Sequence, residues 1–135
     1  MIGKIDHLGM AVRSLDEGLA LWGDLLGLEP AGAETVEGQG VRTAFLNVGE
    51  TRLELLEPTG PDTPVGRFLH KRGPGFHHIC FVVEDIEAAI SRLQSRGMRL
   101  VDEQPRHGAQ GSKVAFLHPG STGGVLVELK QESAG

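Results

Sequence analysis

The stretch that decides the fold is residues 5–12, IDHLGMAV, because a matching stretch, FHHICFVV, recurs at residues 76–83. Each is a short apolar run that predicts a β-strand, and each leads into an amphipathic run that predicts a helix ending at a glycine. His7 and His78 hold matching positions, 71 residues apart (78 − 7 = 71). The chain therefore contains a sequence repeat with one histidine in the opening strand of each copy.

An apolar-Glu-apolar triplet recurs later in each copy, as Leu53-Glu54-Leu55 and as Val127-Glu128-Leu129. The two glutamates are 74 residues apart (128 − 54 = 74), close to the spacing of the histidines. A glutamate between apolar residues usually lies on the solvent face of an alternating strand. Four matched positions favour a different interpretation, in which two imidazoles and two carboxylates surround one metal ion. The predicted ligands are His7, Glu54, His78 and Glu128.

Both copies predict the same order of elements: a strand, a helix, and then about three strands. The repeat modules occupy about residues 4–58 and 75–131, and a linker with a short helix joins them at 59–74, within a single domain of 135 residues. Ser14 or Asp16 is expected to cap the first helix, and Asp85 the second. The predicted strands are 5–12, 41–48, 52–56, 76–83, 114–117 and 125–129.

Composition narrows the possible partners and locations. The net charge of −5 argues against a nucleic-acid partner, which would require a basic surface. No apolar stretch approaches transmembrane length and the N-terminus lacks an apolar signal core, so neither a membrane nor an export signal is expected. Cys80 is the one cysteine and cannot form an internal disulfide, which fits a cytoplasmic location. We interpret it as a buried apolar residue.

A set of two imidazole nitrogens and two carboxylate oxygens suits a divalent metal, such as Co, Mn, Ni, Fe or Zn, and does not choose among them. Two octahedral positions would remain open for substrate. Strand alternation sends His77 and His78 to opposite faces, and the repeat assigns the ligand to His78. The remaining histidines have no counterpart in the repeat and are not expected to be ligands; these are His70, His107 and His118.

The motifs resemble the methylmalonyl-CoA epimerase family of the vicinal oxygen chelate (glyoxalase/bleomycin resistance/dioxygenase) superfamily. The resemblance covers roughly Lys4 to Lys130. The first His and the last Glu are typical of the whole superfamily, whereas the other motifs are more specific to the epimerases. The motifs are IDHLGMAV at 5–12, LELLEP at 53–58, GFHHI at 75–79, FLHP at 116–119 and GGVLVEL at 123–129.

This resemblance implies an α+β fold in which two paired βαβββ modules form an incomplete barrel around the metal site. It also implies a homodimer that interconverts (2R)- and (2S)-methylmalonyl-CoA by proton transfer at C2 through a metal-stabilised enolate. Some family members carry a proposed catalytic glutamate where this chain has Thr43, and a threonine cannot act as a base near neutral pH. We therefore expect Glu128 and Glu54 to serve as the two catalytic bases.

An acyl-CoA substrate requires local positive charge on this acidic chain. Four cations near the linker helix and the Gly-rich stretch at 107–111 are candidates for the CoA phosphates: Lys71, Arg72, Arg106 and Lys113. Among these, Arg72 and Lys113 are the preferred substrate-binding residues, and Ser121 is a candidate for the substrate carboxylate.

Three other functions remain open at this point. A glyoxalase-type lactoylglutathione lyase resembles this chain in the same four ligands, so the ligands alone do not separate it from an epimerase. A non-catalytic binding protein of the same fold often lacks those ligands. An extradiol dioxygenase usually has a longer chain and a site of two histidines and one carboxylate.

Overall fold

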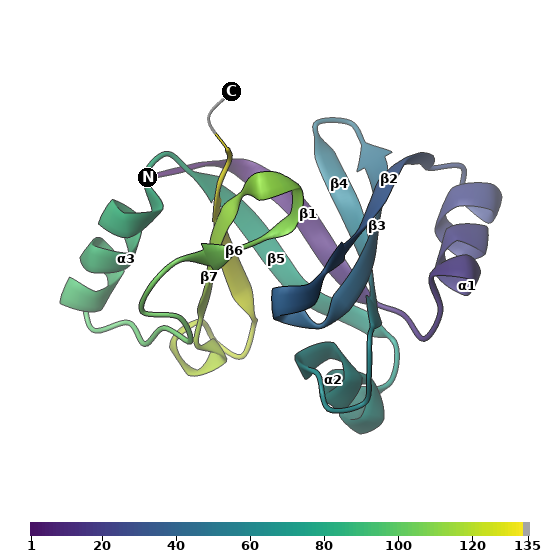
Figure 1. Ribbon diagram of the computed structural model, residues 1–135. Helices are drawn as coiled ribbons and strands as arrows, with labels where there is room; N and C mark the ends of the chain where they lie inside the picture. The colour runs from purple at the N-terminus through teal and green to yellow at the C-terminus, as the bar shows by residue number, and fades with distance from the viewer. Residues whose placement is uncertain (134–135) are drawn as a thin grey trace. The chain divides into compact units, whose positions relative to one another are not determined.

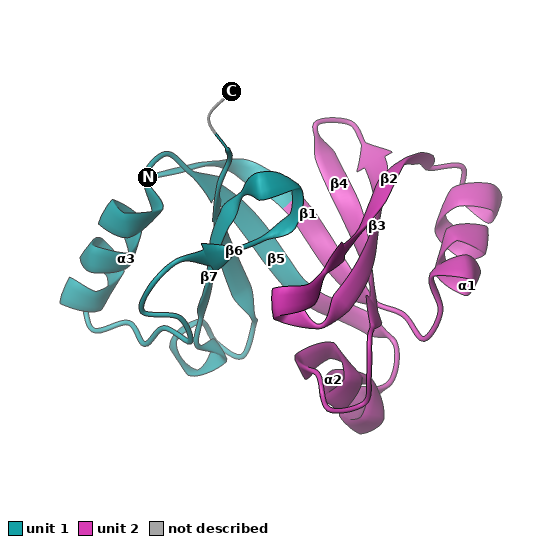
Figure 2. Cartoon of the chain, viewed as in Figure 1, with its two compact units in different colours: residues 1–6, 78–135 teal, residues 7–77 magenta. Residues whose placement is uncertain are grey.

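The computed structural model of the protein describes residues 1–133. The chain forms two compact units, which Figure 2 shows in different colours. Unit 1 contains residues 1–6 together with the chain from His78 onward, and unit 2 contains residues 7–77. The first strand therefore begins in unit 1 and ends in unit 2.

Both units contain a strand, a helix and three further strands (Figure 1). Short 3-10 turns lie between some of these elements. The elements of unit 2 are the second part of β1 (Ile2–Ala11), α1 (Leu15–Leu19) with a π-helical continuation (Ala20–Leu25), β2 (Glu29–Val36), β3 (Val41–Val48), β4 (Thr51–Pro58) and α2 (Pro64–Arg72). Those of unit 1 are the first part of β1, β5 (Gly75–Val83, whose first three residues belong to unit 2), α3 (Ile86–Ser95), β6 (Arg106–His107), β7 (Lys113–Leu117) and β8 (Val127–Gln131).

Strand order is the same in both units. It runs β2-β3-β4-β1 in unit 2 and β6-β7-β8-β5 in unit 1, so the first and last strands of each module are parallel neighbours. The intervening strands pair antiparallel. The predicted α+β class and the two βαβββ modules are confirmed.

Each unit has its own apolar core between its sheet and its helix. The core of unit 2 contains Leu46, Leu53 and Leu55, and Leu15, Leu19 and Trp22 from the helical segment pack against it. The core of unit 1 contains Ile86 and Ile90 of α3 together with Ala115, Leu117 and Leu129 of β7 and β8. The near-helical spacing of these apolar residues therefore identifies the buried face of each helix.

The first residue of each helix is tied to the last strand of its own module. The Leu15 amide donates to Glu57 Oε1 at 3.0 Å in unit 2, and the Ile86 amide donates to Gln131 Oε1 at 2.9 Å in unit 1. Each contact satisfies an amide that has no partner within the helix. The Glu57 of the LELLEP motif is thus a structural residue that holds α1 against β4.

The helix caps follow the sequence prediction. Of the two candidates for α1, Ser14 is the cap, because its side chain accepts a hydrogen bond from the Glu17 amide, whereas Asp16 lies in the first turn. Asp85 caps α3 by accepting from the Ala88 amide at 3.1 Å.

Some features of the described residues were not predicted. Strand β2 has no apolar alternation because it is an edge strand in which only Val36 is buried. Strand β6 has only two residues, too few for a periodic signal. The helix after β1 changes to a π-helical segment at Ala20, and the last strand begins at Val127, two residues later than expected.

Removal of the α3 cap gives a first test of this architecture. We expect Asp85→Ala to lower the free energy of unfolding by about 1 kcal/mol, because the Ala88 amide loses its acceptor. Urea denaturation followed by circular dichroism measures the change. The control is Glu84→Ala, which alters an exposed carboxylate one residue earlier. Equal losses in both variants would show that the cap is not the cause.

Candidate metal site

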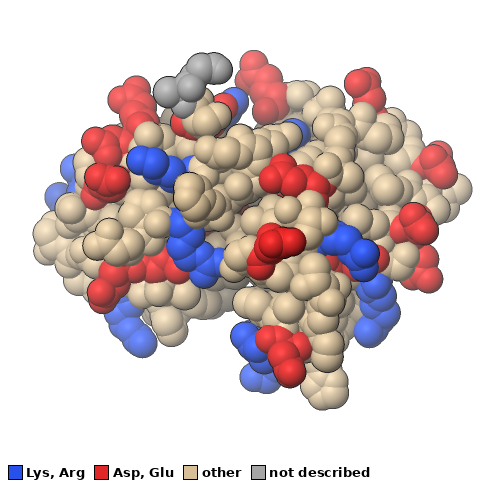
Figure 3. All heavy atoms as spheres, in the orientation of Figure 1, with Lys and Arg blue, Asp and Glu red and all other residues tan. Residues whose placement is uncertain are grey.

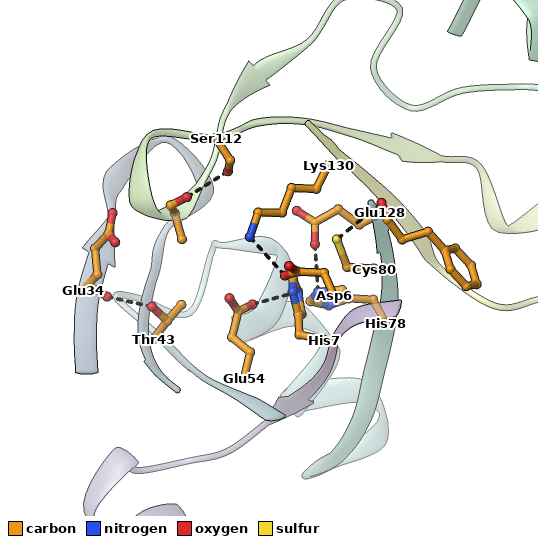
Figure 4. Close-up of polar contacts among 12 residues, drawn as sticks. Asp6, His7, Glu34, Thr43, Glu54, His78, Cys80, Ser112, Glu128 and Lys130 are labelled. Atoms are coloured by element: carbon orange, nitrogen blue, oxygen red, sulfur yellow. Dashed lines mark hydrogen bonds and ion pairs between the residues drawn. The ribbon is translucent and has the colours of Figure 1, made fainter. Parts of the chain in front are cut away.

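Unit 2 buries one histidine–glutamate pair. His7 lies on β1 and Glu54 on β4, and their exposed fractions are 4% and 7%. The His7 Nε2 atom lies 3.4 Å from Glu54 Oε1 (Figure 4). The two strands are parallel neighbours in which Gly9, two residues after His7, pairs with Glu54. Strand alternation then places His7 and Glu54 on the same face of the sheet.

Unit 1 buries the equivalent pair. His78 of β5 is 3% exposed and Glu128 of β8 is 5% exposed. The His78 Nε2 atom lies 3.0 Å from Glu128 Oε1, and the Phe116 ring meets the imidazole edge-on with 5.8 Å between centroids. Cys80, two residues after His78, pairs with Glu128. This register repeats that of unit 2, so the two pairs are built in the same way.

Glu54 does not lie on a solvent-exposed face of its strand, which is the usual position of a glutamate between apolar residues. Leu53, Glu54 and Leu55 are all buried, so both faces of β4 are covered at this point. Burying a carboxylate costs several kcal/mol unless a partner compensates it. Each buried carboxylate here has an imidazole nitrogen beside it, and such N/O donors suit a divalent cation. The donor chemistry of each unit therefore fits a metal ligand pair.

The double histidine separates as strand alternation predicts. His78 is buried beside Glu128, whereas His77 is partly exposed and its ring packs edge-on against Phe68 of α2, with 4.9 Å between centroids. His118 accepts a hydrogen bond from the Gly120 amide through Nδ1. His70 and His107 are exposed.

Thr43, which replaces the glutamate of some family members, lies on β3 and is 2% exposed. Its hydroxyl donates to the Glu34 backbone carbonyl at 3.0 Å (Figure 4). Thr43 and Glu34 are opposite each other in the β2–β3 register. The hydroxyl thus has a structural hydrogen bond within unit 2.

Most of the residues expected to bind substrate contact other residues of this chain. The Arg72 guanidinium lies over the Phe68 ring, 5.7 Å from its centroid, and the Lys113 ammonium lies 3.8 Å from Glu87 Oε1. Ser121 Oγ accepts a hydrogen bond from the Arg99 amide at 2.9 Å. Of the other candidate cations, Arg106 pairs with Asp102, and Lys71 is exposed near the end of α2. Figure 3 shows basic and acidic side chains interspersed on the face in view.

A buried ion pair that the repeat did not predict joins Asp6 to Lys130 within unit 1. Their exposed fractions are both 7%, and Lys130 Nζ donates to Asp6 Oδ2 at 3.1 Å (Figure 4). The available signal was positional. Asp6 precedes His7 directly, and Lys130 follows Glu128 by two residues and therefore shares its face of β8.

No helix among residues 1–133 is long and apolar enough to cross a membrane.

Comparisons of the sequence with known proteins agree on one family. Residues 6–116 match the model of the Glyoxalase/Bleomycin resistance protein/Dioxygenase superfamily. The chain is 40% identical to the mitochondrial methylmalonyl-CoA epimerase of Homo sapiens, over 96% of this chain and 74% of that protein. It is 41% identical to the ethylmalonyl-CoA/methylmalonyl-CoA epimerase of Cereibacter sphaeroides, over 97% and 99% of the two chains.

A solved structure agrees with these relatives. It is a variant of the Streptomyces coelicolor methylmalonyl-CoA epimerase in complex with 2-nitronate-propionyl-CoA, 38% identical with a TM-score of 0.95, covering 99% of this chain and 97% of that one. Identity of this size over nearly the full length goes beyond a shared fold. The chain therefore belongs to the methylmalonyl-CoA epimerase family of the Glyoxalase/Bleomycin resistance protein/Dioxygenase superfamily.

Proposed function

We propose that the protein is a metal-dependent epimerase that interconverts (2R)- and (2S)-methylmalonyl-CoA. The observation that carries the proposal is the pair of buried His–Glu contacts, one in each unit, at matching positions of the repeat. The proposal is supported by relatives of that activity at about 40% identity.

We propose His7, Glu54, His78 and Glu128 as the residues that hold one divalent ion, with Co, Mn, Ni, Fe and Zn as the candidates. The two glutamates balance the charge of +2 when both are ionised, and the two imidazoles bind as neutral ligands. When bound, the ion is a Lewis acid that withdraws electron density from the thioester carbonyl and makes the C2 proton more acidic.

The two glutamates are also the proposed proton carriers. One carboxylate accepts the proton from C2, which leaves the substrate as its enolate. The other, in its protonated form, donates a proton to the opposite face of C2, so the configuration inverts and no net proton is lost. The equivalent positions of Glu54 and Glu128 in the repeat support this division of roles. Thr43 has no part in it, because a threonine hydroxyl is not a base near neutral pH.

Substrate contacts outside the metal ligands are assigned by chemistry. Arg72 and Lys113 are the proposed partners of the CoA phosphates, because both are exposed cations. Ser121 Oγ accepts from the Arg99 amide and keeps its own proton to donate to the substrate carboxylate. We further propose that the protein is a cytoplasmic homodimer acting in propionate metabolism; sedimentation at several concentrations tests the dimer.

Proton exchange at C2 tests the proposed activity directly. We expect the protein to exchange the C2 proton of (2R)- or (2S)-methylmalonyl-CoA in D2O, as followed by NMR, and to lose this exchange when a chelator removes the ion. Re-addition of Co²⁺ or Mn²⁺ should restore it. A parallel assay with methylglyoxal and glutathione should give no product. Absence of metal-dependent exchange at C2 would contradict the epimerase proposal.

A further inference from the structure

We infer that the buried Asp6–Lys130 ion pair positions His7 as a metal ligand. This inference rests on the metal site proposed above, and it assigns a role to two residues outside the four ligands. Both side chains are more than nine-tenths buried, and Lys130 Nζ lies 3.1 Å from Asp6 Oδ2. The two residues are 124 positions apart in the sequence, so the contact joins the two ends of the chain.

The Asp6–Lys130 contact lies where β1 passes from one unit to the other. Residues 2–6 of the strand belong to unit 1, and residues 7–11 belong to unit 2. Asp6 is therefore the last residue that unit 1 holds, and the ligand His7 follows it directly. Consecutive Cα atoms are about 3.8 Å apart, so a fixed Asp6 leaves the backbone of His7 little freedom.

The other end of the pair lies on a ligand strand. Lys130 is two residues after Glu128 on β8, so both side chains project from the same face of that strand. The Glu128 carboxylate contacts His78, and the Lys130 ammonium contacts Asp6 (Figure 4). Strand β8 thus carries the proposed ligand Glu128. Through Lys130 it also holds Asp6, the residue directly before the proposed ligand His7.

Stability alone is a poor explanation for such a pair. Removing two charges from water costs nearly as much as their attraction returns, and apolar replacement of both partners is often neutral. A buried ion pair specifies one arrangement, however, because either charge left alone is costly. This property suits a contact that sets the register of β1 where the strand passes from one unit to the other.

An alternative role for the Asp6–Lys130 pair predicts the opposite change in metal affinity. A carboxylate next to His7 is itself a possible ligand, and Lys130 would then act by keeping Asp6 away from the ion. Loss of Lys130 would release Asp6 and tighten metal binding. In the positioning role, loss of Lys130 weakens binding. The direction of the change in affinity therefore separates the two roles.

The experiment measures Mn²⁺ affinity of the full chain by isothermal titration and by the EPR signal of free Mn²⁺. We expect Lys130→Met and Asp6→Asn each to weaken binding about tenfold or more, as is usual for groups that orient metal ligands. We expect the double variant to match either single variant, because both substitutions remove one shared interaction. Glu87→Gln is the control, since it makes the same carboxylate-to-amide change in the exposed Lys113–Glu87 pair of unit 1. Its affinity should equal that of the unmodified chain.

Every result of these titrations either supports the positioning role of the Asp6–Lys130 pair or overturns it. Unchanged or tighter Mn²⁺ binding in a folded single or double variant overturns it, and so do losses that multiply in the double variant. If a single variant fails to fold, the double variant decides, because it contains neither charge of the pair. If the unmodified chain binds neither Mn²⁺ nor Co²⁺, the proposed metal site fails. If it binds and the variants bind equally well, only the positioning role fails.

Discussion

We expect Glu128→Gln to lower the rate of epimerisation by about 10²–10⁴-fold, which is the usual contribution of a positioned acid–base group. The amide has nearly the shape of the carboxylate, and its oxygen can still contact a cation, but it cannot accept a proton near neutral pH. The same loss is expected for Glu54→Gln in unit 2. Rates are measured with each epimer separately, at saturating metal.

Solvent exchange distinguishes the two glutamates. Each carboxylate is proposed to serve one face of C2, so one variant should retain deuterium exchange with the (2R) epimer and the other with the (2S) epimer. Bound metal must be measured in both variants, so that lost chemistry is not confused with a lost ion. If either variant keeps near-normal exchange with both epimers and near-normal epimerisation, that glutamate is not a base.

Thr43→Val provides the control for this assignment. It removes the hydroxyl that donates to the Glu34 carbonyl and keeps the shape of the side chain. We expect the epimerisation rate to change by about threefold at most, since the hydroxyl is not a base. Complete loss of activity in a folded Thr43→Val protein would contradict a mechanism with two carboxylates.

The second large effect is expected at the double histidine. His78→Ala should weaken metal affinity more than about 100-fold, because removal of a ligand should cost more than removal of the groups that orient ligands. His77→Ala should leave the affinity within about threefold, because the His77 ring packs against Phe68 and lies apart from the His78–Glu128 pair. Titration of both variants with Mn²⁺ measures the difference.

The two substitutions are matched controls for each other, since they make the same change at neighbouring positions of one strand. Circular dichroism confirms that both variants fold. Equal losses of affinity would show that the repeat assigned the ligand incorrectly, and a larger loss in His77→Ala would reverse the assignment.

The repeat explains why much of the site was predictable. A β-strand alternates its side chains with period two, and a helix repeats its apolar face about every 3.6 residues, so both patterns are visible in a sequence. Matching strands therefore identified the two modules. Matching residues within them identified His7, Glu54, His78 and Glu128, which the structure buries as one His–Glu pair in each unit.

Other features had no local signal. Edge strand β2 is largely exposed and shows no alternation, and β6 is too short to show any. The triplet Leu53-Glu54-Leu55 has the same pattern as a half-exposed strand. Only the packed structure shows that β4 is covered on both faces at this point.

The sequence by itself determined the two modules, their order of elements and the four candidate ligands, because each depends on local periodicity or on a spacing that recurs along the chain. Tertiary structure alone decided the burial of Glu54, the point at which β1 passes between the units, and the contact of Asp6 with Lys130. These features depend on pairing between strands that lie far apart in the sequence. Periodicity within one segment carries no information about which distant segment will lie beside it.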